Sequence, residues 1–128
     1  MTSPKLPIPV TPFINIQVTV VQKPSGTGSE SYDVFCNPES ITVTAPDSVI
    51  NYQLVEPTPQ EIVFSGVDTK PDHNHQLSAA TISVSGKLLT LSDANTKDQI
   101  LDLTLKFHDK RGKEIAFDPQ VINRPDAM

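Results

Sequence analysis

Hydrophobic and polar residues alternate most regularly along residues 100–108. The hydrophobic members occupy every second position and comprise Leu101, Leu103, Leu105 and Phe107. Because successive side chains of a strand point to opposite faces, this alternation predicts a strand with one face in a core and the other in water. Turn residues at 109–113 and a second, shorter strand at 114–117 follow it, as in a hairpin.

The same alternation recurs in shorter segments along the rest of the chain. The further strands that it predicts lie at 14–20, 32–36, 41–43, 50–54, 62–64, 82–84 and 88–91. Segments rich in proline, glycine, asparagine and aspartate separate them, including a turn at 23–29, and no segment is typical of a helix. Gly86 suits the turn of a hairpin between the strands at 82–84 and 88–91.

This succession of short strands predicts an all-β fold. Without a helix to connect parallel neighbours, the strands are expected to pair antiparallel. Two antiparallel sheets packed face to face, as in an immunoglobulin-like β-sandwich, are the natural arrangement, and a closed barrel is the alternative. The length of 128 residues suits one domain. We place that domain at 13–128, after an extended, proline-rich tail at 1–12.

The composition indicates which classes of partner and which cell compartment suit this chain. The net charge of −5 argues against nucleic acid, because phosphate binding requires a concentrated basic surface. No apolar run approaches the roughly 20 residues that span a bilayer, so no membrane association is expected. The N-terminal prolines do not fit a signal peptide, and the single cysteine excludes an internal disulfide. These features together predict a cytoplasmic protein.

One segment gathers residues that could bind a metal. His73 and His75 stand two residues apart within Asp-His-Asn-His, and they would share one face of an extended segment. Such a pair suits zinc or copper, but a site needs further ligands, and His108 or Cys36 could join only through the fold. We therefore expect a solvated loop and no cofactor here, with metal binding at His73 and His75 as the alternative function.

Catalytic chemistry has little support in the sequence. Cys36 with His108 or His73 could form a nucleophile and base, but a catalytic thiol needs a lowered pKa and an oriented partner. Cys36 alternates with Val34, so a small, buried apolar residue is the expected role. No glycine-rich phosphate loop, nucleophile elbow or zinc-protease motif is present. The prediction is a protein that is not an enzyme.

The C-terminal segment 118–125 is the first candidate contact surface. Prolines at positions 119 and 125 fix the backbone on either side of two apolar residues. One interpretation is a capped edge strand, and the other is a docking segment for a protein partner or a second copy of the chain. The expected contact residues are Asp118, Val121, Ile122, Asn123 and Arg124. Loops at 68–78 and 92–99 are further candidates, because loops on a rigid scaffold often carry recognition.

Three segments together resemble a known family. The stretch 91–96, the strand at 100–108 and the ending 117–125 are similar to the DP-EP family of small bacterial proteins. An Asp-Pro at 118–119 fits that name, and a Glu-Pro stands at 56–57. The resemblance, over about residues 14–125, implies an immunoglobulin-like sandwich and no catalytic residues. The function we predict is a non-catalytic binding or assembly module.

Overall fold

The computed structural model describes residues 10–23 and 32–125. Within these residues it contains ten strands and no helix. The strands are β1 (Phe13–Gln22), β2 (Tyr32–Asn37), β3 (Ser40–Val43), β4 (Ser48–Leu54), β5 (Val63–Lys70), β6 (Thr81–Ile82), β7 (Leu88–Asp93), β8 (Gln99–His108), β9 (Glu114–Phe117) and β10 (Gln120–Asn123). The part of the chain described here thus has no helix that is long and apolar enough to cross a membrane.

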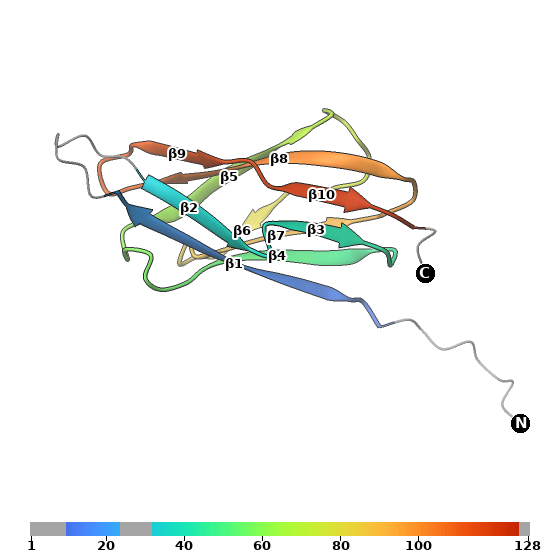
Figure 1. Cartoon of the computed structure of the whole chain (residues 1–128), viewed down its shortest axis with the longest axis horizontal. Coiled ribbons are helices and arrows are strands. Elements are labelled where there is room, and N and C mark those ends of the chain that lie inside the picture. Colours follow the sequence, from blue (N-terminus) through green and yellow to red (C-terminus); the bar gives the residue numbers. More distant parts are fainter. Residues whose placement is uncertain (1–9, 24–31, 126–128) are drawn as a thin grey trace, which may run out of the picture.

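The strands form two sheets that pack face to face. The first sheet has the order β2-β1-β4-β7-β6. The second has the order β3-β10-β8-β5, and β9 pairs with β8 beside β10. Figure 1 shows β5, β8, β9 and β10 as one layer above β1 and β4. The all-β sandwich predicted from the sequence is confirmed, and the sheets do not close into a barrel.

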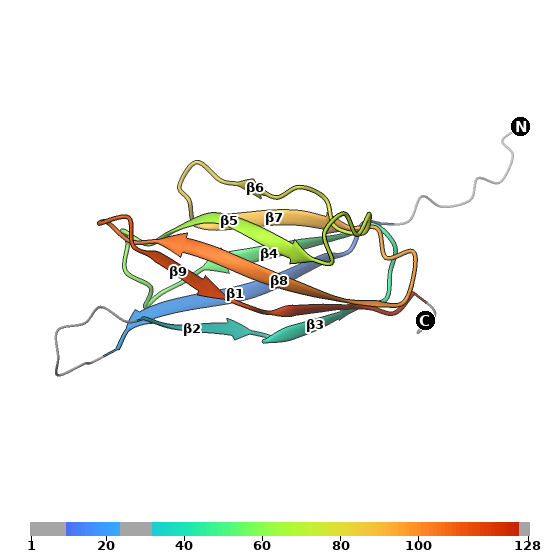
Figure 2. The same cartoon turned by 90° about the horizontal axis from the view of Figure 1, so that it is seen from above.

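Two strand pairs differ from the antiparallel prediction. β1 pairs with β4, and β3 pairs with β10, in parallel. The prediction assumed that parallel neighbours need a helical crossover. Here the chain leaves the first sheet after β2, contributes β3 to the second sheet, and returns as β4, so strands replace the helix. Figure 2 shows β2 and β3 following one another along one edge of the molecule.

The alternating residues fill the space between the sheets. Leu101, Leu103, Leu105 and Phe107 are each 0% exposed, as the pattern in 100–108 predicts. The rings of Phe64 and Phe107 lie 5.0 Å apart between centroids, in a tilted arrangement that favours aromatic contact. The interior is therefore a continuous apolar core with strands on both sides.

Glycine supplies the backbone of two turns. Gly86, with φ of 76°, closes the hairpin between β6 and β7, as predicted. A Cβ atom on Gly86 would lie 2.6 Å from Cβ of Val63, so glycine is also required by the close approach of β5. Gly112, with φ of 81°, closes the turn between β8 and β9, and no atom lies within 4 Å of its Cβ position. In this second turn only the backbone conformation favours glycine.

A lysine fixes the loop that joins β4 and β5. The Nζ atom of Lys87 donates hydrogen bonds to the carbonyl oxygens of Gln60 at 2.7 Å and Ile62 at 2.5 Å, and a longer one to Pro59 at 3.4 Å. Thr58 accepts a hydrogen bond from the backbone N–H of Val20 at 3.0 Å. The loop is therefore attached to β1 and to the residue that precedes β7.

The C-terminal strand lies inside the second sheet and not at its edge. β10 has β8 on one side and β3 on the other, and Val121 is 0% exposed. The interpretation of 118–125 as a capped edge strand is therefore wrong, because β3 pairs with β10 in parallel and covers it. The tail predicted at 1–12 and the turn predicted at 23–29 fall largely outside the described residues.

Candidate functional site

Polar residues occupy the inward-facing positions at one end of the sandwich. Four strands end there on a polar inward residue, namely Ser48 of β4, Asp93 of β7, Gln99 of β8 and Asn123 of β10. Asp93 and Asn123 are 0% exposed, and Ser48 is 1% exposed. An apolar core thus gives way to buried polar groups at this end, and such groups require hydrogen-bond partners.

Asn123 is the centre of a buried hydrogen-bond network. Its Nδ2 donates to Oδ1 of Asp93 at 3.1 Å and to Oε1 of Gln76 at 3.2 Å. The same Gln76 oxygen accepts the backbone N–H of Thr96 at 2.8 Å, and Nε2 of Gln76 donates to the Thr96 hydroxyl at 2.8 Å. The backbone N–H of Asn95 donates to Oδ1 of Asp93 at 3.0 Å. We call these five residues the polar network.

The polar network joins the three segments that the sequence singled out as contact candidates. Gln76 comes from the loop at 68–78, Asn95 and Thr96 from the loop at 92–99, and Asn123 from the segment 118–125. The ends of these segments are therefore held together at one end of the fold. That arrangement is rigid, because each member of the network accepts or donates more than one hydrogen bond.

Burial dominates the electrostatics of the network. It raises the pKa of the Asp93 carboxyl above its ordinary value, and the hydrogen bonds from Asn123 and Asn95 oppose that shift only in part. Among the described residues, no lysine or arginine pairs with this carboxyl group. Asp93 is thus a buried acid whose carboxyl group accepts hydrogen bonds from an amide and a backbone N–H. No cationic side chain of the described residues pairs with it.

The histidines of the loop at 68–78 do not lie on an extended segment. His73 and His75 have φ values of 53° and 60°, so the segment is not extended as the metal hypothesis required. Between them, Asn74 is buried and accepts the backbone N–H groups of Gln76 and Leu77 at 2.9 Å each. Both imidazoles are exposed. The hydrogen bonds of Asn74 fix the loop between them.

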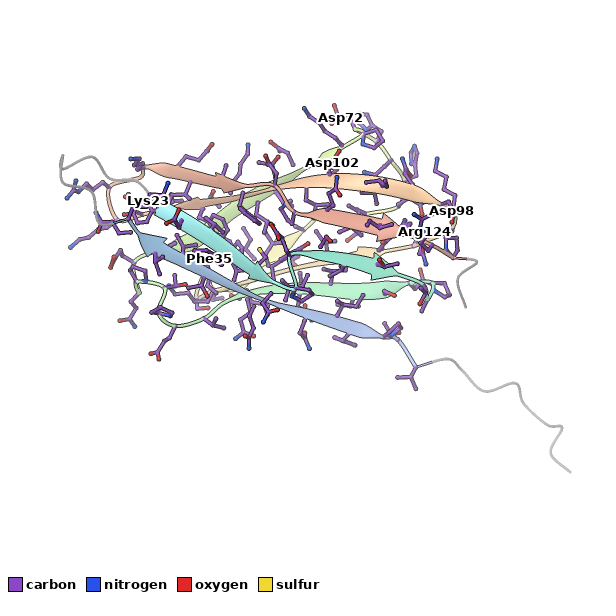
Figure 3. All side chains as sticks on the ribbon, in the orientation of Figure 1. Lys23, Phe35, Asp72, Asp98, Asp102 and Arg124 are labelled. Carbon is purple, nitrogen blue, oxygen red and sulfur yellow. The ribbon has the colours of Figure 1, made fainter. Side chains whose placement is uncertain are left out.

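The histidine pair is not part of a larger group of metal-binding side chains within the described residues. In the described parts of the chain, no group of three or more His, Cys, Asp or Glu side chains could hold a metal ion. Figure 3 labels Asp72 on this loop, where it projects away from the sheets. The geometry gives the metal-binding alternative at His73 and His75 no third ligand.

Beside the polar network lies a small apolar patch on the outer face of the second sheet. Ile100 of β8 and Ile122 of β10 stand directly opposite each other, and Ile100 is 53% exposed. They line a hollow of about 230 Å³ with Asp98 and Arg124, which Figure 3 labels at the same end of the molecule. We call these four residues the outer patch.

The predicted contact residues of 118–125 divide into two groups. Asp118 and Arg124 are exposed and Ile122 is half-buried, so their side chains can meet a partner. Val121 and Asn123 are both 0% exposed. The prediction that these two residues contribute to a contact surface is wrong, because alternate residues of a strand inside a sandwich face the core.

The cysteine is not arranged as a nucleophile. Burial, with a smaller contribution from Glu39, raises the pKa of the Cys36 thiol to about 12. A nucleophilic cysteine requires the opposite shift. Cys36 packs in part against the apolar core, in agreement with the small apolar role expected of it. His108 is exposed, and its Nδ1 lies 3.3 Å from the carbonyl oxygen of Asp109.

Comparison with known proteins decides the family. A family model described as the DP-EP family matches residues 12–125, which is most of the chain. The chain belongs to the DP-EP family. Among curated proteins the search gives no significant match. The resemblance noted in the sequence is therefore confirmed for the family, and it carries no substrate or partner with it.

The two dipeptides that fit the DP-EP name occupy different places. Asp118 and Pro119 lie at the break between β9 and β10, where the carbonyl of Pro119 accepts the N–H of Leu103 at 3.0 Å. This hydrogen bond joins the break to β8. Glu56 and Pro57 follow β4, at the end of that strand away from the polar network. The two dipeptides thus lie at separate positions in the sandwich and do not form a common site.

Sequence reasoning missed Asp93 of the polar network and the neighbouring Gln99, which both face inward. Asp93 continues the alternation of Leu89 and Leu91, and Gln99 precedes Leu101 in the same phase. Extending the two-residue period beyond the last hydrophobic residue would have placed both side chains inward. Gln76 and Asn95 carry no such signal, because they lie in loops.

Proposed function

We propose that this member of the DP-EP family is a cytoplasmic, non-catalytic binding or assembly module. It contacts a protein partner, or a second copy of itself, through the outer patch. The observation that carries the proposal is the pair of exposed Ile100 and half-buried Ile122 beside the polar network. An apolar centre with charged residues at its rim, here Asp98 and Arg124, is the usual anatomy of a protein interface.

Rigidity of the surroundings supports this choice of surface. Asn123 and Gln99 lie on the same strands as the outer patch, and Asn123 is tied to two neighbouring segments. A surface that is already ordered loses less conformational entropy on binding than a mobile loop does. The outer patch is therefore already ordered before a partner binds.

A non-catalytic role has support in the chemistry of the titratable groups. The raised pKa of Cys36 keeps its thiol protonated near neutral pH, and no base is hydrogen-bonded to it among the described residues. The only cysteine is a free thiol, which fits a reducing compartment such as the cytoplasm.

Charge substitution in the outer patch tests the proposal. Truncation before β10 is unsuitable, because it would remove a strand from the middle of a sheet. Ile100→Asp places a carboxylate on the exposed side of β8, and Val84→Asp is the matched control, because Val84 is fully exposed on the turn after β6. Circular dichroism checks that both variants keep the wild-type fold.

Partners are measured by affinity capture from an extract of the source cell, and self-association by sedimentation velocity. The wild type and Val84→Asp should retain the same partner or the same oligomer, and Ile100→Asp should weaken it about tenfold or more, as expected for a charge in a desolvated interface. If all three proteins show the same partners and the same mass, the outer patch is not the contact surface.

A further inference from the structure

Four buried oxygen atoms at the polar end of the sandwich have no hydrogen-bond partner among the described residues. They are Oδ2 of Asp93, Oδ1 of Asn95, Oε1 of Gln99 and Oδ1 of Asn123. Asp93, Asn95 and Asn123 are at most 2% exposed, so bulk water does not reach these groups. Buried acceptors are almost always satisfied in folded proteins, and four together require an explanation.

The residues that carry these oxygens are neighbours. Asn123 and Asn95 both donate to the other oxygen of the Asp93 carboxyl, at 3.1 and 3.0 Å. Gln99 stands directly opposite Asn123 in the pair of β8 and β10. Both side chains therefore project from the same face of the sheet. The four residues thus form one cluster that three strands and the loop after β7 supply.

Oxygen is the only donor type in this cluster. One carboxylate and three amide carbonyls form the ligand set that hard cations such as Ca²⁺ prefer. A buried carboxylate also needs a compensating charge, and no lysine or arginine in the described residues supplies one to Asp93. A cation bound by these oxygens would supply both the positive charge that Asp93 lacks and the partners that the four acceptors lack.

We propose that Asp93, Asn95, Gln99 and Asn123 bind a hard metal cation through these four oxygens. Gln99 and Asn123 also contribute to the lining of the hollow of about 230 Å³ beside the outer patch, so the site lies close to the molecular surface. The site differs from a histidine or cysteine centre in using amide carbonyls for three of its four ligands. It is independent of the proposed binding function, and its test does not involve a partner.

The charge of the ligand set limits the affinity. Calcium affinity rises with the number of carboxylates, and here there is one, so weak binding of Ca²⁺ is expected. A monovalent ion such as Na⁺ would be neutralised fully by that single carboxylate. Mg²⁺ requires near-ideal octahedral geometry and retains several waters, so it should respond least.

Thermal unfolding of the purified, metal-free chain tests the site. The melting temperature, Tm, is recorded by circular dichroism in CaCl₂, NaCl and MgCl₂, each against choline chloride at equal ionic strength. We expect Ca²⁺ or Na⁺ to raise Tm by about 4–7 °C at ten times its Kd, relative to choline chloride. Calorimetric titration of Ca²⁺ into the metal-free chain gives the stoichiometry.

Three variants keep the test decisive. Asp93→Asn removes the charge and should abolish the response. Gln99→Ala, at a half-buried position that folding tolerates better, should weaken the apparent affinity about tenfold or more. Asp98→Asn changes an exposed carboxylate next to Gln99 and should leave the response intact.

Two results would overturn the proposal. One is a Tm that changes no more in Ca²⁺ or Na⁺ than in choline chloride, as expected if the cluster holds only water or a proton on Asp93. The other is a response that survives in Asp93→Asn and Gln99→Ala but disappears in Asp98→Asn, which would place the ion on the surface.

Discussion

Replacement of Asn123 by alanine is the most direct measure of what the polar network contributes to stability. The side chain is 0% exposed and donates two hydrogen bonds, one to the carboxyl of Asp93 and one to the amide oxygen of Gln76. Asn123→Ala removes both donors from the middle of the second sheet. The backbone of β10 and its pairing with β3 and β8 need not change.

The expected loss follows from the partners that remain. Asp93 keeps the N–H of Asn95 and Gln76 keeps the N–H of Thr96, so neither acceptor loses every donor. A hydrogen bond to a charged group contributes about 1.5–3 kcal/mol and one between neutral groups about 0.5–1.5 kcal/mol. We therefore expect Asn123→Ala to lower the free energy of unfolding by about 2–3 kcal/mol.

Urea unfolding followed by far-ultraviolet circular dichroism measures this loss, since the chain has no tryptophan for fluorescence. With an m value of about 1–3 kcal/mol/M, the midpoint should fall by about 0.7–3 M. Gln120→Ala is the matched control on the same strand, because exposed Gln120 donates to the Asp102 carboxyl at 2.9 Å. That control should cost less than about 0.5 kcal/mol. Equal losses in the two variants would refute the reasoning, since burial would then make no difference.

Three further predictions concern other parts of the sandwich. Gly86→Ala should cost about 1–3 kcal/mol more than Gly112→Ala in urea unfolding, because both have positive φ but only the first Cβ overlaps β5; equal costs would contradict the steric argument. Lys87→Ala should destabilise the chain by about 1–2 kcal/mol by leaving loop carbonyls unpaired, whereas Lys97→Ala, at an exposed position, should be nearly neutral; similar midpoints for the two would contradict this. Burial raises the pKa of Asp109, but backbone N–H groups and a tyrosine hydroxyl lower it by more, so its pKa in the folded chain lies below the unfolded value. The ionised Asp109 therefore stabilises the fold above the unfolded pKa, and this stabilisation is lost as the pH falls through the folded pKa. The urea midpoints of wild type and Asp109→Asn should therefore converge below about pH 4, and a constant gap from pH 7 to 3 would contradict this.

The hydrophobic pattern predicted the sandwich because burial decides the phase of each strand. In 100–108 every second residue is apolar, and the structure buries those residues completely. Pairing direction was not predictable in the same way. Whether β1 meets β4 in parallel depends on the intervening strands β2 and β3 changing sheets, and no local pattern encodes such a crossing.

The position of β10 shows that prolines in the sequence do not by themselves predict whether a strand lies at the edge of a sheet. Pro119 and Pro125 suggested an edge, since proline lacks the N–H that a central strand uses. In the structure both prolines lie just outside β10, and its four residues keep their backbone donors for β8 and β3. The exposed and buried members of 118–125 then follow from alternation. The three candidate segments were predictable individually, but their meeting at Asn123 depends on tertiary structure.

Burying polar side chains at one end of an apolar sandwich costs stability, and other interactions of those side chains must offset that cost. Leucine at Asp93, Gln99 and Asn123 would continue the alternation of β7, β8 and β10 and would bury more apolar surface. The hydrogen bonds of Asn123 offset part of the cost by joining the loop of Gln76 and strand β7 to the second sheet, but four acceptors stay unpaired. Register alone does not require those acceptors, because the apolar pairs of β8 and β10 already define it.

The unpaired oxygens are therefore better explained by an ion than by folding specificity. A chain with leucine at all three positions separates the two explanations. It should be at least as stable as the wild type in choline chloride and should no longer respond to Ca²⁺ or Na⁺. A loss of unique structure in that variant would instead assign the network to folding specificity.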